Sequence, residues 1–182
     1  LPGRLVHRPA PFERERAAFL AAVHDGVAEC TAGFGQDRVG CFLSGGTDSS
    51  TIAGMVTRHF GAPARTFSIG FDVGGYDESR YSRLAAKHFG TDHTEYYLKP
   101  GDVLAGVDIV ASDYEQPFGN SSAVPTYFCA RIARDKGITR MLGGDGGDEL
   151  YGGNVRYAKQ AVFAYYERAP LLLRESLVEP LL

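Results

Sequence analysis

Val39-Gly-Cys-Phe-Leu-Ser44-Gly45-Gly46-Thr47-Asp48-Ser49-Ser50 is a short apolar run that leads into a loop of glycines and hydroxyl residues and then into a helix. The backbone N–H groups of such a loop and of the first helical turn point to one place, where the positive end of the helix dipole also favours an anion. Gly45 and Gly46 lack a Cβ, so the backbone can approach a ligand closely. The stretch therefore predicts a phosphate-binding loop. Its alternative is a tight strand-to-helix turn in which Thr47 or Asp48 caps the helix.

The residue types of this loop narrow its chemistry. A Walker loop ends in Gly-Lys-Ser/Thr, and no lysine follows the glycines here to reach a terminal phosphate, so kinase and GTPase chemistry is disfavoured. The loop contains the carboxylate of Asp48 instead of a lysine. Because a carboxylate beside a phosphate requires a cation between them, and Mg²⁺ is the usual bridge, we expect Asp48 to be a magnesium ligand.

A second glycine-rich loop follows the short apolar run at residues 138–142. It contains Asp145, Asp148 and Glu149, three acids within five residues, which repel one another unless a cation or a ligand compensates them. Asp148 is therefore predicted to share the magnesium ion with Asp48. A solvated acidic turn is the alternative, since glycine and aspartate are ordinary turn residues.

Hydrophobic periodicity predicts strands separated by amphipathic helices. The strands are expected at residues 39–43, 65–71, 94–98 and 139–142. Strands joined by crossover helices form a parallel sheet covered on both faces, so the expected fold class is α/β with a twisted parallel sheet. Ligands of such sheets bind at the carboxyl ends of the strands. Both loops fall at that edge, so Ser44 and Gly144 are expected to be neighbours although they are 100 residues apart in sequence.

The same periodicity predicts which side of each helix is buried. For the helix after the second strand, the expected buried residues are Tyr81, Leu84, Ala85 and His88. For the helix that Pro100 starts and for the next one, they are Val103, Leu104, Val107 and Val110, and Val124, Tyr127, Phe128 and Ile132. His93 enters the third strand, where a single histidine is more often structural than catalytic, so it is left out of the catalytic set.

Six segments occur in the order in which one known family carries them. They are Leu43-Ser-Gly-Gly-Thr-Asp-Ser-Ser50, Thr66-Phe-Ser-Ile-Gly-Phe71, Tyr76-Asp-Glu-Ser79, Gly90-Thr-Asp-His93, Glu115-Gln-Pro-Phe-Gly-Asn-Ser-Ser-Ala-Val-Pro-Thr-Tyr127 and Gly144-Asp-Gly-Gly-Asp-Glu-Leu-Tyr-Gly-Gly153. Over roughly residues 11 to 170, the chain resembles the synthetase domain of the glutamine-hydrolysing (class B) asparagine synthetases, which are PP-loop (N-type) ATP pyrophosphatases. The resemblance implies an adenine nucleotide alpha hydrolase-like fold.

The resemblance also implies roles for individual residues. The pyrophosphate pocket would be lined by Ser44, Gly45, Gly46, Asp48, Ser49 and Ser50. The positions that embrace the adenosine are matched by Leu43, Ile69, Gly143 and Gly144. Leu43 and Ile69 are, by residue type, equally expected in the core. Asp48 and Asp148 match the magnesium carboxylates, and Asp145 matches an acidic position tied to formation of the acyl-adenylate, with turn solvation as its alternative. These three aspartates form the expected catalytic set.

The implied reaction is ATP-dependent amide formation, with ATP and Mg²⁺ as cofactors. A carboxylate, such as the side chain of aspartate, attacks the α-phosphorus of ATP, pyrophosphate leaves, and ammonia derived from glutamine displaces AMP to give asparagine. Such chemistry depends on positioning and charge neutralisation more than on a protein nucleophile. The implied partners are these small molecules and a glutaminase domain, and a homodimer is left open.

Two parts of the family pattern are not found. Glutamine-using members begin with the nucleophilic cysteine of a glutaminase domain, whereas this chain begins with Leu1-Pro-Gly3. The family's catalytic lysine lies well beyond the acidic loop, and Lys159 is the only lysine after Asp148. Residues 1–182 are therefore interpreted as one asparagine synthetase-type ATP pyrophosphatase domain, truncated at its C-terminal side, and the isolated fragment is expected to be inactive.

Other functions stay open on these residues. The loops do not identify the acceptor, so a related AMP-forming amidotransferase or a β-lactam synthetase would use the same chemistry. A nucleotide-binding module without turnover belongs to a different class. A tRNA-modifying PP-loop enzyme would need a basic surface, and a net charge of −3 with a pI near 6.0 speaks against it and against any nucleic-acid partner.

Composition places the chain among globular domains, because 44% of its residues are hydrophobic and 23% are charged. The cysteines Cys30, Cys41 and Cys129 lack a Cys-x-x-Cys spacing and are interpreted as reduced, mostly buried thiols of a cytoplasmic protein. No apolar run approaches the ~20 residues that span a bilayer, so no membrane association is expected.

Overall fold

The computed structural model describes residues 11–71, 79–115 and 120–151, together with residues 153, 166, 170 and 174. Within them, four parallel strands form one sheet in the order β3-β2-β1-β4. The strands are β1 (Val39–Phe42), β2 (Arg65–Phe71), β3 (Asp92–Leu98) and β4 (Arg140–Leu142). The predicted α/β fold class with a parallel sheet is confirmed. Strand β3 begins two residues earlier than expected, at Asp92, and therefore includes His93.

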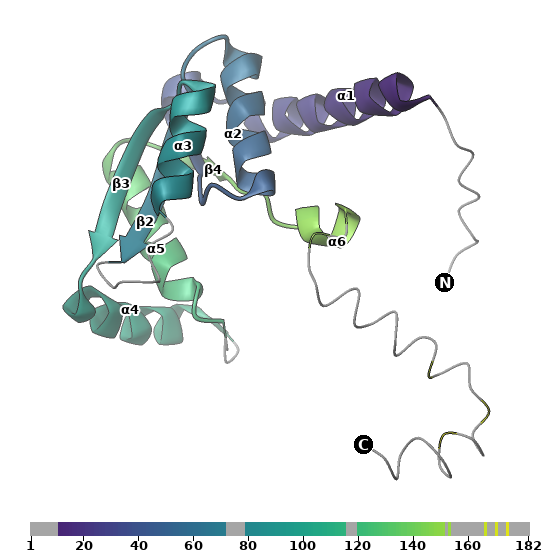
Figure 1. Ribbon diagram of the computed structural model, residues 1–182. Coiled ribbons are helices and arrows are strands. Elements are labelled where there is room, and N and C mark those ends of the chain that lie inside the picture. Colours follow the sequence, from purple (N-terminus) through teal and green to yellow (C-terminus); the bar gives the residue numbers. More distant parts are fainter. Residues whose placement is uncertain are drawn as a thin grey trace. The chain divides into compact units, whose positions relative to one another are not determined.

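Helices cover both faces of this sheet (Figure 1). The described helices are α1 (Phe12–Thr31), η1 (Gln36–Arg38, a 3₁₀ turn), α2 (Thr47–Phe60), α3 (Ser79–Phe89), α4 (Pro100–Asp113), α5 (Ala123–Asp135) and α6 (Gly147–Tyr151). Helices α1, α2 and α3 lie on one face, and α4 and α5 lie on the other. Gly61 ends α2 with a φ of +64°, the left-handed conformation for which glycine is favoured.

Strand β1 shows why the sheet needs two covering layers. Its successive side chains point to opposite faces. Cys41 packs with the buried residues of α1 and α2, whereas Phe42 packs against the cluster around Phe67, Cys129 and Ala133 that joins the sheet to α5. A strand that is apolar on both faces has to be covered on both, which is the arrangement that the chain adopts.

The predicted buried face of α3 is wrong for Tyr81, Leu84 and His88, whereas Ala85 packs against the core cluster as expected. Tyr81 and Leu84 are 57% and 66% exposed, and His88 is exposed as well. The helix instead buries Ser79, Ser82 and Ala86. Apolar periodicity missed this face because β2 and β3 present polar side chains to α3, and small serines can hydrogen-bond to them.

The other predicted helix faces are closer to the structure. In α5, Val124 and Phe128 are buried, as expected. In α4, Val103 and Val110 pack against the cluster of Leu98, Val124 and Phe128, as expected. Leu104 and Val107 are 73% and 51% exposed, so the prediction is wrong for these two residues. None of the described helices combines the length and the apolar character needed to cross a membrane.

The three thiols are free. Cys41 and Cys129 are buried, as predicted, whereas Cys30 is exposed. Burial raises the pKa of Cys41 and of Cys129 to about 12, so both thiols stay protonated and unreactive near neutral pH.

The chain divides into two compact units, residues 1–144 and residues 145–182. The sheet with α1 to α5 belongs to the first unit, and α6 belongs to the second.

Candidate nucleotide-binding site

Two serine hydroxyls meet where β1 ends. Ser44 Oγ and Ser49 Oγ are 2.9 Å apart, and the Ser44 backbone N–H donates to Ser49 Oγ over 3.2 Å. The Gly46 N–H donates to Ser44 Oγ over 3.3 Å. Ser44 is exposed and Ser49 is half-buried, so this pair of hydroxyls can donate to a ligand at the carboxyl end of the strand.

Helix α2 begins at this loop without a side-chain cap. Its N-cap residue is Gly46, and no side chain hydrogen-bonds to the first turn as a cap. The alternative, a tight turn in which Thr47 or Asp48 caps the helix, therefore does not form. The first N–H groups of a helix need partners outside it, and an anion is a favoured one. Asp48 lies in this first turn and is half-buried.

Gly45 is in close contact with the backbone of α3. Its φ is +86°, and a Cβ at this residue would collide with the backbone carbonyl carbon of Tyr81 and lie 2.5 Å from the Ser82 nitrogen. Only glycine satisfies both the left-handed conformation and the close approach to α3. The shape of the loop is thus determined by a contact with a helix that the sequence reasoning did not connect to the site.

The second predicted loop reaches the same place. Strand β4 pairs directly with β1, with Cys41 opposite Leu142. Two residues later, a Cβ on Gly144 would lie 2.7 Å from the Asp48 carbonyl carbon and 2.8 Å from the Ser49 nitrogen. The expectation that the sheet edges carrying Ser44 and Gly144 are neighbours is confirmed, because β4 pairs with β1 and Gly144 packs directly on the first turn of α2.

Several of the predicted site residues turn their side chains away from this surface. Leu43 is 1% exposed and belongs to the core cluster with α1 and α2. Ile69 packs against the clusters on the α5 face. Ser50 Oγ is buried and has no hydrogen-bond partner among the described residues. Leu43 can thus contact an adenosine only through its main chain. The ligand roles of Leu43, Ile69, Gly143 and Ser50 stay predictions.

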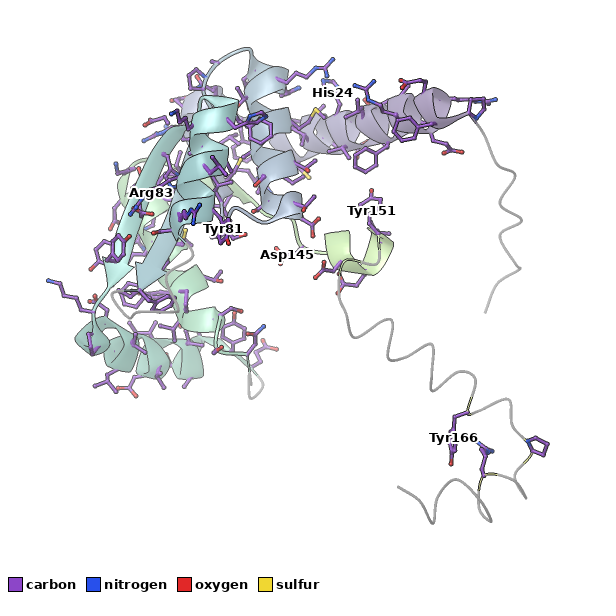
Figure 2. The ribbon with its side chains drawn as sticks, in the orientation of Figure 1. His24, Tyr81, Arg83, Asp145, Tyr151 and Tyr166 are labelled. Carbon is purple, nitrogen blue, oxygen red and sulfur yellow. The ribbon has the colours of Figure 1, made fainter. Side chains whose placement is uncertain are left out.

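Asp145 and Asp148 belong to the second compact unit. Asp145 is exposed (Figure 2). Asp148 lies in the first turn of α6, and its carboxylate carbon is 3.4 Å from where a Cβ on Gly153 would stand. Among the described residues, no group of three or more histidine, cysteine or acidic side chains is arranged to hold a metal. The shared magnesium site of Asp48 and Asp148 stays a prediction.

Parts of the motifs lie outside the described residues, namely residues 76–78, 116–119 and Lys159. Of the features that the sequence reasoning missed, the most informative is the polar face of β2 and β3 beneath α3. In β2, Thr66 and Ser68 alternate with the apolar Phe67 and Ile69, and in β3, His93, Glu95 and Tyr97 alternate with Thr94 and Tyr96. Period-two alternation was therefore the signal that could have revealed it.

The family model of asparagine synthase matches residues 18–181. The chain belongs to this family. A protein of Methanocaldococcus jannaschii assigned as an asparagine synthetase (glutamine-hydrolyzing) is 42% identical over 138 residues, which are 75% of this chain and 26% of that protein. Asparagine synthetase (glutamine-hydrolyzing) 1 of Bacillus subtilis is 33% identical over 140 residues, which are 77% of this chain and 22% of that protein. The chain spans about a quarter of the length of these relatives.

Solved structures share the fold at low sequence identity. The NH3-dependent NAD synthetase from Campylobacter jejuni has a TM-score of 0.50 at 12% identity and covers 76% of this chain and 60% of its own. The NMN synthetase from Francisella tularensis has a TM-score of 0.52 at 15% identity and covers 75% of this chain and 57% of its own. These neighbours support the PP-loop ATP pyrophosphatase fold.

Proposed function

We propose that this chain is the nucleotide-binding part of an asparagine-forming ligase, which adenylates the side-chain carboxylate of aspartate with ATP and then transfers ammonia to it. The observation that carries the proposal is the contact of Gly144 with the backbone of Asp48 and Ser49. It brings the two family loops together at the carboxyl ends of adjacent parallel strands, where ligands of open α/β sheets bind.

The donors of the loop suit the pyrophosphate portion of ATP. Ser44 and Ser49 offer paired hydroxyls, and the uncapped first turn of α2 offers N–H groups and the positive end of its dipole. A Cβ on Gly46 would meet nothing closer than Ser44 Oγ at 3.4 Å, so the backbone there is open to a phosphate. The proposed role of the loop is therefore to bind and orient the pyrophosphate leaving group, and the loop supplies no nucleophile.

The residues present also fit a magnesium ion. Mg²⁺ is commonly held by one or two carboxylates together with substrate phosphates and water. Asp48 offers such a carboxylate beside the hydroxyl pair, and Asp148 is proposed as the second. When bound, the ion would neutralise charge on the pyrophosphate as it departs. Asp145 is proposed to act while the acyl-adenylate forms.

The chemistry needs no protein nucleophile. A carboxylate oxygen of aspartate forms a bond to the α-phosphorus, and the bond to the bridging oxygen breaks with its electron pair on pyrophosphate. Ammonia then adds to the activated acyl carbon, AMP leaves with the electron pair of the ester bond, and the nitrogen loses a proton. The chain's contribution is positioning and charge stabilisation.

The source of the ammonia is proposed by analogy. The relatives are named for glutamine hydrolysis, and this chain matches 22–26% of their length. We propose that a glutaminase domain of a longer protein supplies the ammonia.

Substitution of the two metal carboxylates tests the proposal. Asp48→Asn and Asp148→Asn should each weaken binding of Mg-ATP by about tenfold or more, since an interaction with a charged group is worth roughly 1.5–3 kcal/mol. Titration calorimetry with and without Mg²⁺ measures the effect. Asp108→Asn, at an exposed carboxylate of α4, is the matched control. Unchanged Mg-ATP affinity in both variants would contradict the assignment.

A further inference from the structure

Helix α3 is attached to the sheet in two different ways along its length. Its C-terminal half is held by apolar packing, since Ala86 belongs to the core cluster with α2 and the Phe89 ring lies against Gly54. In its N-terminal half, the large apolar side chains of Tyr81 and Leu84 are exposed, and no apolar packing of this half is found among the described residues. The first turn depends on hydrogen bonds instead.

These hydrogen bonds come from one face of the first turn. Ser79, Ser82 and Arg83 are spaced three and four residues apart and therefore lie on the same side of the helix. Ser79 Oγ is 2.9 Å from Tyr97 OH, and Arg83 donates to the same hydroxyl over 2.6 Å. Arg83 also donates twice to Glu95 Oε2, over 2.6 and 3.0 Å. Arg83 and Tyr81 leave the same end of the helix (Figure 2).

The bonds continue into the sheet. Ser82 Oγ donates to the Ser79 carbonyl over 2.9 Å and approaches Ser68 Oγ at 3.4 Å. Ser68 Oγ is 3.1 Å from His93 Nε2. The Tyr97 ring lies over Gly70, where a Cβ would be 2.7 Å from the ring. Because glycine has no Cβ, the ring has room there to extend toward α3. The first turn is thereby fixed to β2 and β3 in one position.

The first turn of α3 also packs directly against the phosphate-binding loop at Gly45. Gly45 packs on the peptide between Tyr81 and Ser82 with no spare room. A shift of that peptide must therefore move Gly45 or open a gap beneath it. Gly45 lies between Ser44 and Gly46, whose hydrogen bond holds the hydroxyl pair in place.

We propose that Tyr97 and Ser79 are positioning residues for the phosphate loop, acting through the first turn of α3 on Gly45. This inference rests on the proposed function, because it assumes that the loop binds pyrophosphate. Neither residue is proposed to touch the ligand. Their hydrogen bond sets the shape of the loop by holding the Tyr81–Ser82 peptide against it.

Two variants that break the same bond test the inference. Ser79→Ala should weaken the binding of Mg-pyrophosphate about fivefold, which is the equivalent of one neutral hydrogen bond, and Tyr97→Phe should weaken it at least as much because it also removes the acceptor of Arg83. The double variant should bind no more weakly than the weaker single one, since groups that act through one bond are not additive. Affinity for AMP, which lacks the pyrophosphate, should stay unchanged in all three.

The matched control is the neighbouring tyrosine. Tyr96 OH donates to Asp102 on α4 over 3.2 Å, on the opposite face of β3, so Tyr96→Phe removes a hydroxyl bond of the same kind without touching α3. This variant should keep the wild-type affinity for Mg-pyrophosphate. Calorimetric titrations of the complete chain provide all of these values.

The outcomes separate the two proposals. If the wild type binds Mg-pyrophosphate but Tyr97→Phe and Ser79→Ala bind it equally well, the positioning role is refuted and the proposed function stands. Equal losses for pyrophosphate and AMP, or an equal loss in Tyr96→Phe, would show general destabilisation and also refute it. A wild type that binds neither ligand would overturn the proposed function itself.

Discussion

Gly144 is the residue at which the two loops touch. A Cβ there would be 2.7 Å from two atoms of Asp48, one of them backbone, which cannot yield as a flexible side chain would. We expect Gly144→Ala to lower the free energy of unfolding by about 1–3 kcal/mol through overpacking, and to weaken Mg-pyrophosphate binding. Denaturant titration and calorimetry measure the two effects. If the variant matched the wild type in both, the close approach of the loops would not exist.

His93 is the residue whose charge state is coupled to folding. Its Nδ1 is 2.9 Å from Thr66 Oγ1 and its Nε2 is 3.1 Å from Ser68 Oγ, so both ring nitrogens have hydroxyl partners. Burial lowers the pKa of the imidazole from its ordinary 6.5; nearby Arg83 lowers it further, whereas Glu95 and Asp92 oppose the shift. The folded protein therefore favours the neutral ring.

The sign of the pH dependence follows from that shift. The unfolded chain takes up a proton at about pH 6.5 and the folded chain only at lower pH, so the unfolded state binds more protons in between. Above pH 6.5, the ring is neutral in both states, so His93 should not change the free energy of unfolding. Below pH 6.5, the free energy of unfolding should fall as the pH drops. We expect a smaller loss of unfolding free energy between pH 7.5 and 5.5 in His93→Gln than in the wild type. His88→Gln, at an exposed histidine of α3, should behave as the wild type does.

At the scale of elements, α4 offers a matched pair of glycines. A Cβ on Gly106 would lie 2.6 Å from Val124 Cγ1 and 2.8 Å from Phe128 Cε2, so this glycine permits the close contact of α4 with α5. Gly106→Ala should reduce the unfolding free energy by about 1–3 kcal/mol. Its affinity for Mg-pyrophosphate should be unchanged, because neither helix contributes a residue to the loop.

Gly101 is the control in the same helix. No atom lies within 4 Å of a Cβ built there, so Gly101→Ala should be neutral or stabilising by up to about 1 kcal/mol. Thermal unfolding of both variants compares the two positions. A Gly106→Ala protein as stable as Gly101→Ala would show that α4 and α5 are not closely packed.

For the whole molecule, the prediction concerns what the 182-residue chain can do alone. The chain covers 26% of the M. jannaschii relative and 22% of the B. subtilis one. We expect it to bind ATP and AMP with Mg²⁺, because the phosphate loop is formed within it, but to make no asparagine from aspartate with either glutamine or ammonia. Most of the length of those relatives has no counterpart in these 182 residues, and removing even one group that stabilises transition-state charge costs about 10²–10³ in rate.

Mass spectrometry against a control without enzyme measures the product. Asparagine formed from ammonia by the isolated chain would contradict the prediction and would make Lys159 the first residue to substitute. Binding of nucleotide without product is the expected result.

Much of this architecture could be predicted from the sequence, because the sequence patterns that indicate it are local. The apolar run before Ser44 and the glycines after it predict a strand, a loop and a helix within a dozen residues, and the family motifs extend that reading to the α/β fold. The expected parallel sheet also predicted that Ser44 and Gly144 would be neighbours, since parallel strands bring their carboxyl ends to one edge.

The tertiary structure alone decided how the loop is supported. Ser82, His93 and Tyr97 come from a helix and a strand, and none carries a local signal that it will meet the others. Apolar spacing predicted the opposite face of α3, because it assumes that a buried side is apolar. Here the buried side includes Ser79 and Ser82, which hydrogen-bond to other elements, and such pairing depends on the register of β2 with β3 rather than on the residues of α3 alone.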